Sequence, residues 1–185
     1  DFRPNVSAIL NITPDHLNRH GTMENYTRIK ECITLNQTED DSVVLNYDDP
    51  VLREFGQDPD LKPKVTWFSS REKLADGFCM SGDNIVYCQK GRETILVNVR
   101  DMKLLGRHNY ENVMAAAAIG FLMGVALADI GRVAENFNPV EHRIEFVRER
   151  TGVRYYNDSK GTNPDAAIQA LRAMPGPTLL IAGGY

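Results

Sequence analysis

The chain has 185 residues, of which 42% are hydrophobic and 25% charged, and its formal net charge is −4. This composition is typical of a globular protein that can build its own core, and the absence of a basic run argues against nucleic-acid binding. The longest apolar stretch, residues 115–128, is too short and too interrupted by glycine to cross a membrane, so we expect no membrane insertion.

The cysteines indicate a reducing environment. Cys32, Cys79 and Cys88 are odd in number and form no C-x-x-C pair, which argues against a disulfide framework or a zinc site. No positively charged and apolar leader opens the sequence. We therefore expect a cytoplasmic protein.

The first seventy residues alternate between strand-like and helix-like segments. Three segments are apolar and partly β-branched, which favours buried strands: residues 5–12, 42–47 and 65–69. Two segments between them have helical patterns: residues 23–35, with Thr22 as the N-cap, and residues 48–55. This alternation predicts an α/β fold with a mostly parallel sheet flanked by helices.

The pattern of apolar and polar residues changes from about residue 77. Short alternating runs between residues 77 and 97 predict a small antiparallel meander, and two helices are expected at residues 110–125 and 126–137. Asn138 and Pro139 form the best turn signal for a domain boundary, which divides the chain into residues 1–139 and 140–185.

The residues after this boundary predict a second α/β unit. We expect a hairpin from residues 143–147 and 153–156, and then a helix that begins at residues 163–164 and ends at Met174. The apolar segment 178–182 (TLLIA) predicts a buried strand.

A first candidate site follows the first predicted strand. Residues 11–21 (NITPDHLNRHG) lead from that strand into a loop rich in Asp, His and Arg. Ligands of α/β sheets bind at the carboxyl ends of strands, so a site is expected in this loop. An ordinary polar surface loop explains the residues equally well.

A second candidate site is the stretch 104–118 (LLGRHNYENVMAAAA). Asn109 and Asn112 lie one helical turn apart, shortly after the turn opened by Gly106. Side-chain amides both donate and accept hydrogen bonds, which suits the edge of a purine. On local grounds alone, a helix-capping role for Asn109 is favoured over ligand binding.

A third candidate site combines residues 141–143 (EHR) with residues 156–163 (YNDSKGTN). The second stretch joins a strand to a helix and is dense in hydrogen-bond donors. The orphan amides and the dipole at a helix N-terminus favour anions such as phosphate. A simple capping loop has a similar composition.

Taken together and in this order, the three motifs resemble those of the Mur ligase family over essentially the whole chain. NITPDHLNRHG and GRHNYENVMAAAA resemble central-domain motifs, and HRIE with NDSKGTN resembles the start of the C-terminal domain. NDSKGTN is most similar to the MurD type, with Gly161 in place of an alanine. The resemblance implies that residues 1–139 belong to the ATP-binding central domain and residues 140–185 begin a Rossmann-like α/β domain.

The resemblance also implies roles for individual residues. His16 and Lys30, the latter as a carbamate, would be catalytic and would hold a magnesium ion. From the sequence alone, Lys30 is more often a solvated helix residue. Asn109 and Asn112 would face the adenine side of ATP, and His142 and Arg143 would lie at the domain hinge near ribose and phosphates. Asp158 would bind the ribose, and Lys160 and Thr162 would bind the phosphates.

The implied activity is the ATP-dependent and Mg²⁺-dependent addition of D-glutamate to UDP-N-acetylmuramoyl-L-alanine through an acyl phosphate, by a monomeric enzyme of peptidoglycan precursor synthesis. Asn18 stands where the family often has Asp. The 185 residues contain no G-x-x-x-x-G-K-[ST] motif, so we expect the chain alone to be inert and to bind ATP weakly. Two alternatives remain: another Mur ligase, of the MurC or MurE type, and a noncatalytic nucleotide-binding or interaction fragment.

Overall fold

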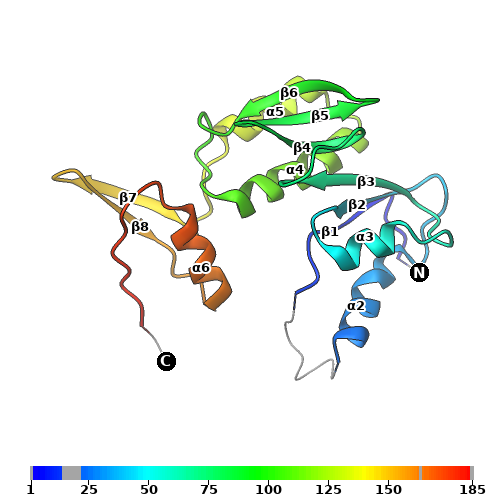
Figure 1. Ribbon diagram of the computed structural model, residues 1–185, viewed down its shortest axis with the longest axis horizontal. Coiled ribbons are helices and arrows are strands. Elements are labelled where there is room, and N and C mark those ends of the chain that lie inside the picture. Colours follow the sequence, from blue (N-terminus) through cyan, green and yellow to red (C-terminus); the bar gives the residue numbers. More distant parts are fainter. Residues whose placement is uncertain (1, 14–21, 163, 184–185) are drawn as a thin grey trace.

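The computed structural model describes residues 2–13, 22–162 and 164–183, and its main feature is a six-stranded sheet (Figure 1). The strands lie side by side in chain order: β1 (Val6–Ile9), β2 (Ser42–Asn46), β3 (Lys64–Ser69), β4 (Gly77–Ser81), β5 (Asn84–Gln89) and β6 (Arg92–Asn98). Neighbours from β1 to β4 are parallel, and β4, β5 and β6 form an antiparallel meander. The predicted α/β fold is confirmed, and the meander continues the parallel sheet.

Helices cover both faces of the sheet. They are α2 (Met23–Glu31), which continues into the 3-10 turn η1 (Cys32–Thr34), and then α3 (Pro50–Gly56), α4 (Arg107–Leu122) and α5 (Leu127–Asn136). Alternate side chains of β2 point to opposite faces. Val43 and Leu45 pack with residues of α2 and α3, whereas Val44 packs with residues of α4 and α5. All three side chains are fully buried, so β2 lies at the centre of both cores.

Capping residues set where the helices begin. Thr22 caps α2, as predicted, by accepting a hydrogen bond from the backbone N–H of Asn25, and Asp49 caps α3. The helix predicted from residue 110 begins three residues earlier, because Gly106 adopts a φ of 92° and occupies the N-cap position. Within the described residues, no helix is both long and apolar enough to span a bilayer.

Helix α5 approaches β6 closely at one glycine. Gly131 is buried, and a Cβ atom at this position would overlap the carbonyl oxygen of Leu96 in β6. The helix axis can therefore come near the strand only because position 131 has no side chain. This contact fixes the helix layer above the antiparallel part of the sheet.

The start of β1 is tied to β2 by two buried polar side chains. Gln37 donates to the carbonyl oxygens of Pro4 and Ser42, and it accepts a hydrogen bond from the hydroxyl of Ser7. Asp41 accepts a hydrogen bond from Arg3 at 2.8 Å, and this bond is the main reason why the pKa of Asp41 is lowered. These contacts fix the register of β1, and therefore where β1 ends.

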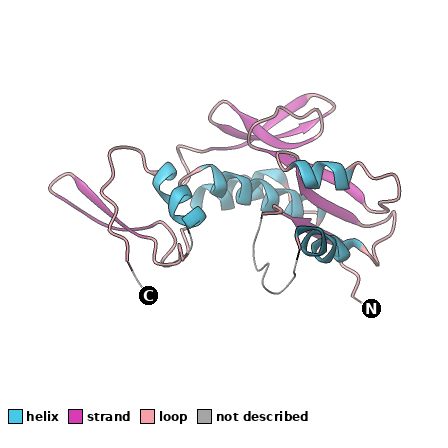
Figure 2. Cartoon of the chain, turned by 60° about the horizontal axis from the view of Figure 1, so that its bottom comes forward, coloured by secondary structure: helices cyan, strands magenta, loops and turns pink. Residues whose placement is uncertain are grey.

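The C-terminal part contains the predicted hairpin and helix. Strands β7 (Glu145–Arg150) and β8 (Val153–Asn157) pair antiparallel, and α6 (Pro164–Ala173) follows. Figures 1 and 2 show this hairpin beyond the first turn of α4, with α6 between the two. A Cβ atom at Gly106 would lie 2.6 Å from the Cβ atom of Ala173, so α6 touches the start of α4.

The prediction of a buried strand at residues 178–182 is wrong. The segment is irregular, and Leu179 and Ile181 are 89% and 92% exposed. A strand needs partners for its backbone N–H and C=O groups. Among the described residues, no backbone hydrogen bond joins this segment to β7 or β8. Apolar β-prone sequence therefore remains irregular here because no strand edge is paired with it.

Two of the three cysteines lie together inside the meander. The sulfur atoms of Cys79 in β4 and Cys88 in β5 are 3.6 Å apart and buried, whereas Cys32 is exposed. Burial, assisted by the neighbouring Cys79 thiol, raises the pKa of Cys88 to about 12. Because the thiolate is the reactive form, Cys88 is protected chemically as well as sterically.

We predict that a thiol reagent such as Ellman's reagent modifies one cysteine of the folded chain rapidly at pH 8 and all three after unfolding. At that pH the raised pKa keeps Cys88 as the unreactive thiol and burial shields it, whereas Cys32 is accessible. Absorbance at the thiol end point gives the count. The variant Cys32→Ser should abolish the rapid reaction, and rapid modification of all three thiols in the folded chain would contradict the described packing.

Candidate active site

Polar side chains gather where β1, β2 and β3 end. The strands are parallel, so their carboxyl ends share one edge of the sheet, which is where ligands of such sheets bind. The polar residues at or just after the ends of these strands include Asn11, Asn46, Asp48, Asp49, Ser69 and Ser70. His16, predicted as a catalytic and metal-binding residue, lies in the segment 14–21 outside the described residues.

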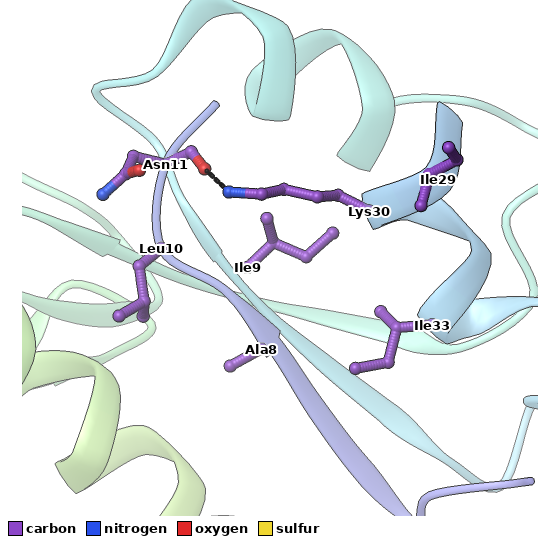
Figure 3. Close-up of a pocket in the computed structure, with 7 residues that line it drawn as sticks. All are labelled: Ala8, Ile9, Leu10, Asn11, Ile29, Lys30 and Ile33. Carbon is purple, nitrogen blue, oxygen red and sulfur yellow. Dashed lines mark hydrogen bonds between the residues drawn. The ribbon is translucent and has the colours of Figure 1, made fainter. Parts of the chain in front are cut away.

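Lys30 reaches this edge from α2. Its ammonium group donates to the carbonyl oxygen of Asn11 at 3.2 Å (Figure 3). The same group lies 4.8 Å from the centre of the Tyr26 ring. The side chain is half-buried and lines a cavity of about 520 Å³ whose other walls are mainly apolar, including Ile9 and Ile29. Lys30 is therefore directed over the end of β1, with its side chain half-buried.

Two further side chains hold the backbone after β1. The side-chain amide of Asn46 donates to the carbonyl oxygen of Leu10 at 3.1 Å. One carboxylate oxygen of Asp49 accepts from the backbone N–H of Ile12 at 2.7 Å, while the other caps α3. Together with Lys30, these residues bind backbone groups of three consecutive residues, 10–12, at the start of the predicted site loop.

A second group of polar contacts connects the strand ends with α4. Asp48 accepts hydrogen bonds from the hydroxyl of Ser69 at 2.6 Å and from the backbone N–H of Ser70 at 2.8 Å. The hydroxyl of Ser70 lies 2.6 Å from a carboxylate oxygen of Glu111 in α4. A cavity of about 300 Å³ opens beside this group, and Thr13 and Arg71 also line it.

The two asparagines predicted to bind adenine lie in the first turns of α4. Asn109 is only 6% exposed, and its amide nitrogen donates to the carbonyl oxygen of Leu105 at 2.7 Å. It is therefore not the helix cap, because Gly106 holds that position. Asn112 is exposed one turn further on. Only Asn112 presents a freely accessible amide.

The two parts of the third predicted segment, which precede β7 and follow β8, are joined by hydrogen bonds into one structure that we call the turn after α5. The backbone N–H of Lys160 donates to the carbonyl oxygen of His142, and the N–H of Ile144 donates to Asp158 at 3.0 Å. His142 and Ile144 have φ values of 66° and 47°, in the left-handed region. Such values are costly for a β-branched residue such as Ile144 and are concentrated at functional turns. Arg143, between them, is exposed.

His108 brings the second and third segments together. The residue is half-buried in the first turn of α4. Burial lowers its pKa, the positive charge of Arg143 lowers it further, and the carboxylate of Asp158 acts in the opposite direction. These effects require Arg143 and Asp158 to lie close to the first turn of α4. Residues far apart in sequence, from α4 and from the turn after α5, thus face one another.

Sequence comparison identifies the family. Residues 1–120 match the Mur ligase middle domain. The chain belongs to the Mur ligase family. It is 51% identical over all its residues to the UDP-N-acetylmuramoylalanine--D-glutamate ligase of Lachnoclostridium phytofermentans, and 52% and 47% identical to enzymes of that name from Lachnospira eligens and Caldanaerobacter subterraneus. The chain spans about 40% of the length of these relatives.

Solved structures of Mur ligases share the fold. MurF from Acinetobacter baumannii matches with a TM-score of 0.72 at 20% identity, over 94% of this chain and 38% of that one. MurC from Thermotoga maritima matches with a TM-score of 0.66 at 23% identity, over 93% of this chain and 38% of that one. The likeness extends over nearly the whole chain and confirms its Mur ligase fold.

Sequence reasoning missed the polar residues that organise this edge of the Mur ligase sheet. The sequence pattern places Asn46 in a strand, and Asp48 and Asp49 at the start of a helix. No local pattern marks Ser70 or Glu111. A signal was present for the first three, because Asn and Asp directly after a buried strand lie at the ligand-binding edge. Ser70 and Glu111 are 41 residues apart, and no local pattern pairs them.

Of the two predicted metal ligands, Lys30 lies among the described residues and His16 lies outside them. Within these residues, no group of three or more His, Cys, Asp or Glu side chains is placed to hold a metal ion. Lys30 lies at the expected edge, next to the strand that leads to His16. Its position fits a magnesium ligand once the amine carries a carboxylate, because magnesium prefers oxygen ligands.

We predict that His108 makes the chain less stable in mild acid. Its pKa is lowered on folding, so the unfolded chain binds the proton more readily, and the stabilising contribution present above pH 6.5 is lost as the pH falls through the lowered value. Thermal unfolding of the wild type and of His108→Gln between pH 7.5 and pH 5 measures this. The acid-side loss of stability should be smaller in the variant. An equal loss in both proteins would contradict the assigned burial.

Proposed function

We propose that this chain is the middle segment of an ATP-dependent UDP-N-acetylmuramoyl-L-alanine:D-glutamate ligase of peptidoglycan precursor synthesis. The observation that carries the proposal is the 47 to 52% identity, over all 185 residues, to three ligases named for D-glutamate addition. Because the chain spans about 40% of those relatives, the activity is proposed for a polypeptide that includes the remainder. In the same proposal, residues 1–139 belong to the central domain and residues 140–185 begin the next, which agrees with the irregular segment between α5 and β7.

The proposed reaction has two steps. The L-alanyl carboxylate of the acceptor attacks the γ-phosphate of ATP, which gives an acyl phosphate and ADP. The amine of D-glutamate then attacks the acyl carbon, phosphate leaves, and an amide bond remains. Both the carboxylate and the triphosphate are anionic, so the site must supply positive charge and fixed positions for the reacting groups.

The proposed metal side consists of Lys30 and His16. Reaction of the neutral Lys30 amine with carbon dioxide would give a carbamate and release a proton, which converts a cation into an oxygen ligand. A magnesium ion held there would neutralise charge on the phosphates. The support from the structure is the direction of Lys30 over the end of β1, where the side chain contacts the backbone that leads to the predicted site loop.

The proposed nucleotide side combines α4 with the turn before α6. Asn109 and Asn112 would lie on the adenine side, where the exposed Asn112 supplies the accessible amide. His142 and Arg143 would lie near ribose and phosphates, and Asp158 would bind the ribose. The phosphates would be bound by Lys160 and Thr162, which are exposed. The influence of Arg143 and Asp158 on the pKa of His108 supports this arrangement, because it requires both groups to lie near the first turn of α4.

We predict that Lys30→Ala lowers the rate of the full-length ligase at least about a hundredfold, as expected when a group that stabilises transition-state charge is lost. A short carboxylic acid such as formate should restore part of the activity by supplying the missing oxygen ligand. Phosphate release measures both effects. Arg28→Ala, at an exposed position of the same helix, is the matched control and should remain active. Full activity of Lys30→Ala would contradict the role.

We predict that the full-length ligase prefers D-glutamate over L-alanine, L-lysine and meso-diaminopimelate by at least about a hundredfold, because a polar site rejects an analogue that leaves its buried groups unpaired. Rates with each amino acid and the UDP-N-acetylmuramoyl-L-alanine acceptor decide between the family types. Preference for a diamino acid, or for L-alanine with an acceptor that lacks alanine, would favour the MurE or MurC type. Nucleotide binding without turnover would favour a noncatalytic role.

A further inference from the structure

Ser70 connects two carboxylates from different elements. Its backbone N–H donates to Asp48, which follows β2, at 2.8 Å. Its hydroxyl oxygen lies 2.6 Å from Glu111 in α4 and 3.1 Å from Asp48. A serine hydroxyl has one proton to donate, and the shorter distance assigns that proton to Glu111. Asp48 is already satisfied by the Ser70 N–H and by the Ser69 hydroxyl.

Glu111 depends on this single contact. Among the described residues, Ser70 is the only hydrogen-bond partner found for its carboxylate, and no ion pair involves it. Glu111 lies beyond the first turn of α4, too far along the helix to cap it. The residue therefore has no evident role within its own helix, and its contact is with the end of β3.

Further hydrogen bonds connect Asp48 with the end of β1. The backbone N–H of Asp48 donates to the side-chain oxygen of Asn46 at 2.9 Å, and the amide nitrogen of Asn46 donates to the carbonyl oxygen of Leu10. Lys30 binds the next carbonyl, that of Asn11. A continuous path of contacts thus runs from α4 through β3 and β2 to the strand end where Lys30 lies.

We propose that Glu111 is a positioning residue for ATP: through Ser70 it fixes the first turns of α4, and hence Asn109 and Asn112, relative to the end of β1, where Lys30 of α2 binds the backbone. This inference rests on the proposed function. Adenine and the transferred phosphate belong to one molecule, so the two parts of the site must keep a fixed separation. Small displacements of positioning groups are costly in phosphoryl transfer, where catalysis depends on placement.

The test compares steady-state kinetics of variants of the full-length ligase. Glu111→Ala should raise the KM for ATP about tenfold, as expected for loss of one hydrogen bond to a charged group, and should leave the KM for D-glutamate unchanged. Ser70→Ala should have the same effect. Glu111→Gln should remain close to the wild type, because its amide oxygen still accepts from Ser70. Glu135→Ala, at an exposed position of α5, is the matched control.

The double variant Glu111→Ala/Ser70→Ala separates positioning from simple stabilisation. If the two residues act through one contact, the double variant should raise the KM for ATP no more than either single variant. Lower thermal stability of Glu111→Ala with an unchanged KM for ATP would overturn the proposal, and so would an effect of Glu111→Ala that Ser70→Ala does not share. A wild-type ligase that releases no phosphate with D-glutamate would instead contradict the proposed function, and this inference with it.

Discussion

The parallel pairing of β1 with β2 is the constraint on which the site depends. A strand that ends in a loop leaves backbone groups without ladder partners, and these groups must be bonded elsewhere. Here Asn46, Asp49 and Lys30 bind the groups of residues 10–12 from three directions. A slip of one residue would turn Ile9 out of the core and remove every one of these contacts. Gln37 and Asp41, at the other end of the pair, prevent that slip.

Helix α4 links the two halves of the candidate site. Glu111 contacts the strand ends through Ser70, and His108, three residues earlier, faces the turn that holds Arg143 and Asp158. Both contacts lie near the start of the helix, while the alanines that follow pack against the sheet. The buried body of α4 therefore connects the turn after α5 with the strand ends.

Much of the fold could be predicted from the sequence, because it follows from local patterns. Runs such as 42–47 fit a buried strand, and Thr22 marks the start of α2 by its chemistry, whereas the start of α4 lies three residues before the predicted one. The failure at residues 178–182 has the opposite cause: strand formation depends on a paired edge, which a local pattern does not reveal. The roles that the motifs give to Lys30 and Asp158 remain predictions. The link from Ser70 to Glu111 could not be predicted, because it depends on tertiary packing across 41 residues.

The close approach of α5 to β6 has a consequence for how such sequences can diverge. Core positions filled by aliphatic side chains can exchange one shape for another if neighbours adjust. Position 131 has no such freedom, because any side chain there meets the carbonyl oxygen of Leu96, which belongs to the backbone and cannot rotate away. The spacing between α5 and the sheet thus depends on the single residue Gly131. Distant sequences that retain this glycine can vary the surrounding core widely and still preserve the layer geometry on which α4 rests.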